Sequence, residues 1–203
     1  LESLRAQGGA DNAALVRIVI DNLASGTDPA AALPTINAAL ALSPEALDLN
    51  LMKVGILAQT GDIEGTGTQL KEMAAKFTDN REIQQALINF YMSQNDIDGA
   101  EAFLRGLAGE DTSDPTGHLS VVQLLQTARG DDAARAELNR LRAANADTEN
   151  GRLYSAMLAS MDFAAGQTEE GIAGLRAALD GAEPDIQTWK LQVTLAQMLA
   201  ATG

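Results

Sequence analysis

Residues 87–107 read LINFYMSQNDIDGAEAFLRGL, and this stretch decides the fold. Apolar residues recur at helical spacing on both sides of the dipeptide Asn95-Asp96. Asparagine tolerates the left-handed conformation that closes a helix, and a following aspartate can cap the free N–H groups of the next helix. The stretch therefore predicts two helices, 81–94 and 97–108, joined by a tight turn.

The same turn signal recurs along the chain, at Thr27-Asp28, Gly61-Asp62, Gly130-Asp131, Gly166-Gln167 and Gly203. The intervals between successive turns are 34, 34, 35, 36 and 37 residues. A period near 34 residues is typical of helix-turn-helix arrays. The pattern predicts an all-α chain without strands, with helices at 11–25, 29–42, 45–60, 63–77, 81–94, 97–108, 115–129, 131–145, 149–165, 168–180 and 185–201.

Small and large apolar residues keep fixed distances from these turns, in a pattern that resembles the tetratricopeptide repeat family. The first hairpin, counted from Thr27, matches at Val16, Val19, Leu23, Ala32, Ile36, Ala39 and Pro44. The third, counted from Asn95, matches at Leu87, Tyr91, Ala100, Leu104 and Leu107. The fourth fits only when it is counted from Arg129, one residue before Gly130.

The resemblance covers residues 11 to 203 and implies a right-handed α-solenoid of about five repeats plus a terminal helix. As one domain over 1–203, the repeats fall at 11–44, 45–80, 81–114, 115–148 and 149–184, with a partial repeat at 185–203. Similar arrays belong to bacterial envelope proteins, so the resemblance favours the periplasm or envelope over the cytoplasm.

Both ends of the sequence suggest a fragment of a longer array. Leu1 and Leu4 are spaced like the end of a preceding helix, although a floppy terminus is an equal alternative. Helix 185–201 carries Trp189 and Leu199 but has no second helix after it. Natural arrays end in a polar capping helix, so this helix predicts an open apolar face through which the chain could self-associate.

Composition excludes several classes of partner. Fourteen basic and 28 acidic residues give a net charge of -14, which repels nucleic acid and anionic lipid. No run approaches the roughly 18 apolar residues of a membrane span, so we expect no membrane insertion. Cysteine is absent, which removes disulfides and thiolate sites.

Catalytic, metal and cofactor sites are not expected. His118 is the only histidine, and at a helix start we interpret it as a surface residue. The acidic run that begins at Asp96 resembles a calcium loop but has Arg105 in place of the final glutamate. Gly65-Thr66-Gly67 lacks the third glycine of a dinucleotide fingerprint, so close helix packing is the better interpretation.

The resemblance implies that the first helix of each hairpin lines a concave wall. Residues predicted to be free to contact a protein or peptide there are Leu51, Gln85, Asn89, Met92, Ser120, Leu124, Ser160, Phe163, Val193 and Gln197. They lack the Lys and Arg of a carboxylate clamp, and Met92 and Phe163 are candidate apolar anchors. We expect a non-catalytic binding scaffold. The alternatives are an architectural or self-associating spacer, and the regulatory or substrate-holding region of an enzyme.

Overall fold

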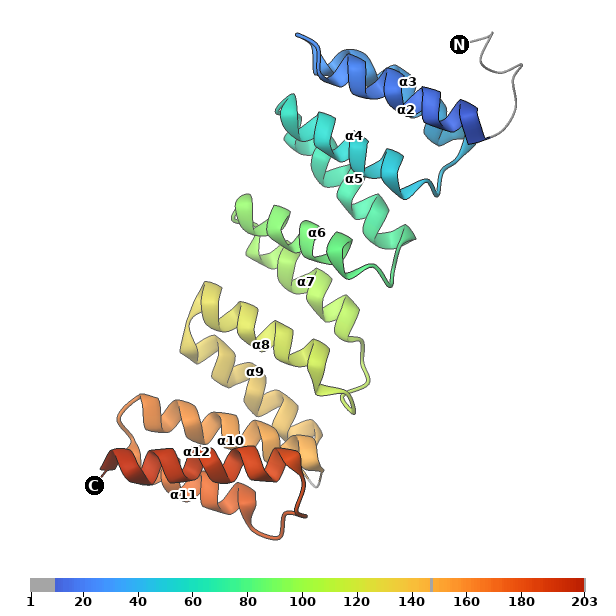
Figure 1. Ribbon diagram of the computed structural model, residues 1–203. Coiled ribbons are helices and arrows are strands. Elements are labelled where there is room, and N and C mark those ends of the chain that lie inside the picture. The colour runs from blue at the N-terminus through green and yellow to red at the C-terminus, as the bar shows by residue number, and fades with distance from the viewer. Residues whose placement is uncertain (1–9, 147, 203) are drawn as a thin grey trace. The chain divides into compact units, whose positions relative to one another are not determined.

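The computed structural model describes residues 10–146 and 148–202, which fall into two compact units, Leu1–Asn95 and Asp96–Gly203. All regular structure in the described ranges is helical, as predicted: eleven α-helices and one 3-10 helix (Figure 1). The predictions for Leu1, Leu4 and the turn at Gly203 lie outside the described residues. The division between the units falls inside the third predicted repeat, between its two helices.

The first unit contains two helix hairpins followed by one helix. The hairpins join α2 (Ala10–Ala24) to η1 (Pro29–Ala32) and α3 (Leu33–Leu42), and α4 (Leu47–Gln59) to α5 (Ile63–Lys76); α6 (Arg81–Ser93) packs on α5. Ile20, Ala32, Ile36, Leu49 and Ile56 form a buried cluster that joins the first hairpin to α4. Each hairpin therefore covers one apolar face of the next, as a repeat array requires.

The second unit follows the same plan. It consists of α7 (Ile97–Ala108), α8 (Pro115–Arg129), α9 (Asp131–Ala144), α10 (Glu149–Ala164), α11 (Thr168–Leu179) and α12 (Ile186–Thr202). One buried cluster joins α8, α9 and α10 through Val122, Leu138 and Tyr154. A second cluster joins α10, α11 and α12 through Ala159, Leu175 and Met198.

The predicted turn residues have the conformation their type suggests. Gly61, Asn95, Gly130 and Gly166 all have a positive φ, between 56° and 86°. Most of the predicted aspartate caps also form: Asp62 accepts from the N–H of Gly65 at 2.8 Å, and Asp96 and Asp28 make equivalent bonds. These turns join the first helix of each hairpin to the second.

The turn between α8 and α9 is shorter than expected. Gly130 is itself the N-cap and Asp131 is already helical, so the predicted cap by Asp131 is wrong; its carboxylate accepts from Gln126 instead. The fourth residue of each second helix is nevertheless small and buried, namely Thr66, Ala100, Ala134 and Gly171. The position of the small residue is therefore constant when it is counted from the start of the second helix, and only the length of the turn before α9 differs, by one residue.

The segment predicted as one helix over 29–42 is divided in two. Asp28 and Pro29 start a 3-10 turn, and the α-helix begins only at Leu33, with Pro34 in its first turn. Pro34 has no N–H to donate to a carbonyl four residues earlier, so regular α-helical bonding begins after it.

Close helix packing explains Gly67 of α5, whereas Gly65 leaves space for the side chain of the N-cap residue Asp62. A Cβ atom on Gly67 would lie 2.6 Å from the ring of Phe90 on α6. The absence of a side chain at Gly67 therefore lets α6 approach, which agrees with the packing interpretation of this glycine-rich stretch.

Candidate functional site

Helices α4 and α6 of the first unit, and α8, α10 and α12 of the second, expose neutral side chains, and we name these side chains the first-helix wall of their unit. In the first unit it contains Leu51 on α4 and Gln85 and Asn89 on α6, all exposed. Nε2 of Gln85 donates to Oδ1 of Asn89 at 2.9 Å, which aligns the two amides along the helix. Met92, predicted beside them, is half-buried.

On α8 one residue that was predicted to be exposed is buried. Leu124 is only 8% exposed and packs in the core, so the expectation that it faces a ligand is wrong. The wall of α8 consists of Thr116, Ser120, Gln123 and Thr127, of which all but the half-buried Ser120 are exposed. The short turn at Gly130 moves the exposed face by one residue, and counting from Arg129 would have pointed to Gln123.

On α10 the two residues predicted to contact a ligand, Ser160 and Phe163, both make contacts within the chain. Ser160 is half-buried, and its hydroxyl donates to the carbonyl of Ala156 at 2.9 Å. Phe163 packs against the buried cluster of α10, α11 and α12, and a Cβ atom on Gly171 would lie 2.7 Å from it. Phe163 therefore fills a helix interface. Its role as an anchor for a ligand has no support from these contacts.

On α12 both predicted residues are at the surface. Val193 is 36% exposed, and Gln197 is also exposed. The wall residues of the second unit are thus Thr116, Ser120, Gln123, Thr127, Ser160 and Gln197, with the apolar Val193 beside them. None of these side chains carries a charge.

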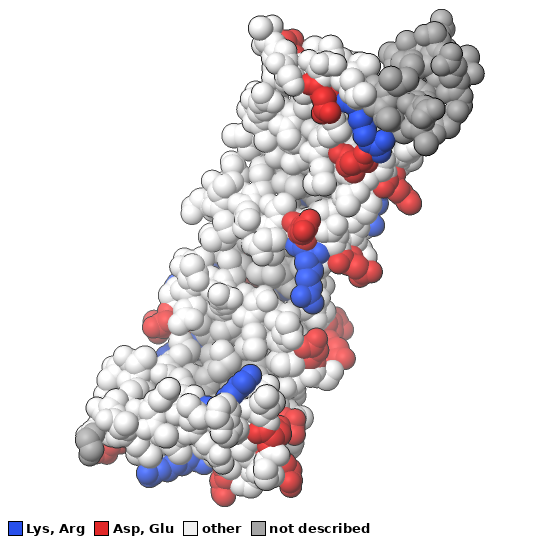
Figure 2. Space-filling view, in the orientation of Figure 1, with Lys and Arg blue, Asp and Glu red and all other residues white. Residues whose placement is uncertain are grey.

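Acidic side chains gather where the first helices begin. They include Glu45, Asp48, Asp79 and Glu82 in the first unit and Asp111, Asp114, Glu149, Glu183 and Asp185 in the second. Figure 2 shows acidic groups along the edge of each unit where the loops between hairpins lie. Backbone N–H groups lower the pKa of Asp111, Asp114 and Asp185 here, and carboxylates at helix N-termini are favourable against the helix dipole.

The second helices of the second unit carry an ion-pair network. Both oxygens of Glu137 on α9 accept from Arg105 on α7, at 3.0 and 2.9 Å, and Arg140 donates to Glu137 at 2.7 Å. Burial alone would raise the pKa of Glu137, but the two guanidinium groups outweigh it and lower the pKa to about 2. Arg105 and Arg129 also bond Glu101. These charges are paired with one another and stabilise helix packing.

His118 is not the surface residue that the sequence suggested. It is 4% exposed, and its Nε2 lies 3.0 Å from the carbonyl oxygen of Asp111. Asn150 on α10 donates to the carbonyls of Thr112 and Ser113 in the same loop, at 3.1 and 2.7 Å. The imidazole is buried because it anchors this loop, which has the same length as the loop before α12 and is longer than the loops before α4, α6 and α10.

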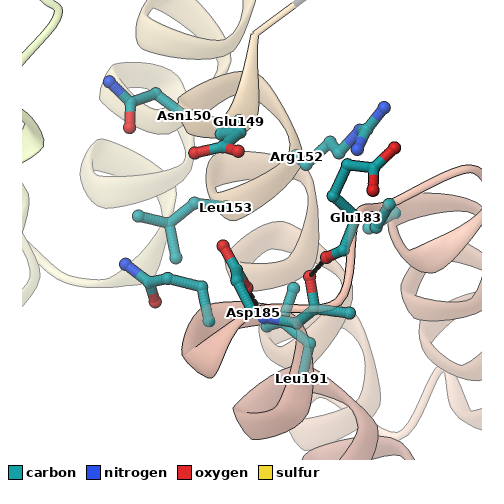
Figure 3. Close-up of a pocket in the computed structure, with 11 residues that line it drawn as sticks. Glu149, Asn150, Arg152, Leu153, Glu183, Asp185 and Leu191 are labelled. Atoms are coloured by element: carbon teal, nitrogen blue, oxygen red, sulfur yellow. Dashed lines mark hydrogen bonds between the residues drawn. The ribbon is translucent and has the colours of Figure 1, made fainter.

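A small pocket lies between the start of α10, the loop before α12 and α12 itself (Figure 3). Its volume is about 60 Å³, far below the roughly 300–1,000 Å³ of small-molecule sites. Asp185 caps the N–H of Thr188 at 2.6 Å, and the Thr188 hydroxyl donates to the carbonyl of Glu183 at 2.8 Å. The polar groups of the pocket thus serve the helix start.

Neither a metal cluster nor a membrane-spanning helix occurs in the described residues. No group of three or more His, Cys, Asp or Glu side chains within 10–146 and 148–202 is placed to hold a metal ion. No helix in the same ranges is long and apolar enough to cross a membrane.

Residues 68–125 match the model of the family described as tetratricopeptide repeat. Among solved structures, a thermophilic TPR protein of Thermus thermophilus is 18% identical, with a TM-score of 0.44 over 91% of this chain and 97% of that one. A tetratricopeptide repeat protein of Parabacteroides merdae is 14% identical, with a TM-score of 0.42 over 91% of this chain and 72% of that one. No curated protein matches the sequence.

Proposed function

We propose that this chain, a tetratricopeptide repeat protein, is a scaffold that holds a polypeptide segment against its first-helix wall. The repeat fold suggests protein interaction in general. The finer proposal rests on one observation: the wall residues are neutral amides, hydroxyls and apolar groups, and the charged Arg129 and Asp162 on α8 and α10 are paired with residues of the second helices.

The wall has the hydrogen-bonding capacity that a peptide main chain needs. Gln85, Asn89 and Gln123 are exposed amides, and each can both donate and accept. The hydroxyls of Ser120 and Ser160 donate to carbonyls of their own helices, at 3.2 and 2.9 Å, which leaves their oxygens free to accept. A polypeptide presents N–H and C=O groups alternately, so this mixture fits an extended segment.

The charges of the wall and of the whole chain indicate which kind of polypeptide segment would bind. The wall lacks the Lys and Arg side chains that would hold an acidic C-terminus, and the chain carries a net charge of -14. A neutral segment with a basic flank fits best, because the flank would be drawn to an acidic edge, which Asp79 and Glu82 form within the first unit and Asp114 and Glu149 form within the second. Such attraction weakens as salt rises.

A display library of random peptides, selected against the whole chain, tests the proposal. We expect the enriched peptides to carry basic flanks and to bind with a saturable calorimetric signal that weakens between low and high salt. The double variant Gln85→Ala, Asn89→Ala and the single variant Gln123→Ala should each weaken binding by at least about tenfold, in the range of an interface hot spot.

Control variants Ala136→Ser and Arg176→Ala, at exposed positions on α9 and α11, should leave the affinity unchanged. Equal losses at wall and control positions would place the partner elsewhere. An absence of any saturable peptide would favour a purely architectural role.

A further inference from the structure

Helix α12 has two different faces. Leu191, Leu195 and Met198 point into the second unit and pack on the cluster shared with α10 and α11. On the opposite side, Trp189 is 61% exposed and Ile186 is 72% exposed. Residues at the 186, 189, 193, 196 and 200 positions form one stripe by helical spacing, and we name this the α12 stripe.

Comparison with α10 shows what the α12 stripe is shaped to contact. The two helices hold equivalent places in successive repeats, 37 residues apart, so that Ala156 and Ala159 correspond to Val193 and Ala196. On α10 these positions are buried, because α11 packs over them. On α12 they are exposed. The stripe is therefore a helix-packing surface without its helix in the described residues.

The side chains of the α12 stripe become smaller from the start of the helix to its end. Its first half carries the large residues Ile186, Trp189 and Val193, and its second half carries Ala196 and Ala200. When two copies of one helix pack antiparallel, the first half of each faces the second half of the other. Large residues then meet small ones on both sides of the two-fold axis, as an isologous interface requires.

We propose that the α12 stripe docks a second copy of this chain, with the two α12 helices antiparallel. Trp189 of each copy packs over Ala200 of the other, and Val193 packs beside Ala196. The contact shares Val193 with the wall surface of α12 but uses no residue of α8 or α10, so the two proposals can be tested separately, at Gln123 and at Trp189.

Charge also favours a second copy. Lys190 is the only charged side chain between Ile186 and Thr202, although the chain as a whole carries -14. The acidic excess therefore does not oppose contact at this helix. In the antiparallel pair, Lys190 lies beside the last turn of the partner helix, where the helix dipole is negative.

The chain provides its own reporter, because Trp189 is its only tryptophan. Sedimentation of the 203-residue chain should show a concentration-dependent rise from 21.2 kDa to twice that mass. Over the same concentrations the tryptophan emission should shift to the blue and become shielded from acrylamide. A chain that stays at 21.2 kDa up to millimolar concentration, or that dimerises with Trp189 still exposed, overturns the proposal.

A size swap tests the antiparallel register. Trp189→Ala and Ala200→Trp should each weaken dimerisation by at least about tenfold, as loss of a buried aromatic anchor does. The double variant keeps one tryptophan over one alanine at both contacts, so its dimer affinity should return to within about threefold of the original. If the double variant loses as much dimer affinity as the two single variants together, this register is refuted.

A matched control uses another exposed apolar residue. Ile63 on α5 is 56% exposed, and Ile63→Glu should leave dimerisation unchanged, whereas Val193→Glu should abolish it. Both variants should keep the helical circular dichroism of the parent chain, because both positions are at the surface. Equal loss from the two variants would show that dimerisation is non-specific.

Discussion

The ion-pair network around Glu137 permits a quantitative prediction. Glu137 is 5% exposed, and its pKa falls from an ordinary 4.5 to about 2 because Arg140 and Arg105 hold the charged form. This lowering of the pKa corresponds to a stabilisation of the folded state of about 3 kcal/mol at neutral pH. Glu137→Gln keeps the shape of the side chain but leaves two guanidinium groups without their carboxylate. We therefore expect the 203-residue chain to lose about 3 kcal/mol in its free energy of unfolding, or about 6–12 °C in Tm.

The contribution of Glu137 to the free energy of unfolding decreases as the pH falls. Because the folded-state pKa of Glu137 is below the unfolded-state value, its stabilisation is complete above about pH 4.5 and is lost as the pH falls towards 2. Urea unfolding followed by circular dichroism should show a large gap between the parent chain and Glu137→Gln at pH 7 that narrows below about pH 4. The control Asp98→Asn removes a carboxylate that is 93% exposed and should cost under about 1 kcal/mol. A constant gap across pH, or one no larger than that of the control, would refute the reasoning.

Three further predictions concern the free energy of unfolding, measured in urea. Asp96→Ala should cost about 1 kcal/mol because Asp96 caps α7, whereas Asp131→Ala should be near neutral, since Asp131 caps nothing and alanine favours the helix. Gly151→Ala should cost about 1–3 kcal/mol because its Cβ would lie 2.0 Å from the carbonyl oxygen of Asn145, while Gly106→Ala, with no atom within 4 Å, should be stabilising. Tyr154→Phe should gain about 1 kcal/mol, because its buried hydroxyl has no hydrogen-bond partner within the described part of the chain. Equal effects within either pair, or a large loss at Tyr154, would contradict these accounts.

The helix pattern was readable from the sequence because it depends on local chemistry. A left-handed residue followed by a capping side chain marks Gly61-Asp62 and Asn95-Asp96, and both turns form as predicted. Proline chemistry explains the largest boundary error, since Pro34 delays the start of the α-helix from Pro29 to Leu33. The turn at Gly130 was found, but its length was not, because glycine there serves as both turn and N-cap.

The candidate site was less predictable because exposure depends on helix rotation. One residue of error in the turn length rotates a helix by about 100°, which is enough to exchange the buried Leu124 for the exposed Gln123. Burial of His118 depends on a loop that folds back over α8, and nothing near His118 in the sequence signals it. Phe163 has the right spacing for the wall, yet Gly171 leaves space beside it, so Phe163 is half-buried against the cluster of α10, α11 and α12.

The central claim, that a polypeptide lies along the first-helix wall, is tested most directly by site-specific photocrosslinking to a library-selected peptide. A benzophenone side chain would replace Asn89 or Gln123 on the wall, and Ala136 or Arg176 on the second helices. We predict peptide adducts at the two wall positions and none at the other two. Adducts that form equally at Ala136 and Arg176, or only there, would contradict the claim.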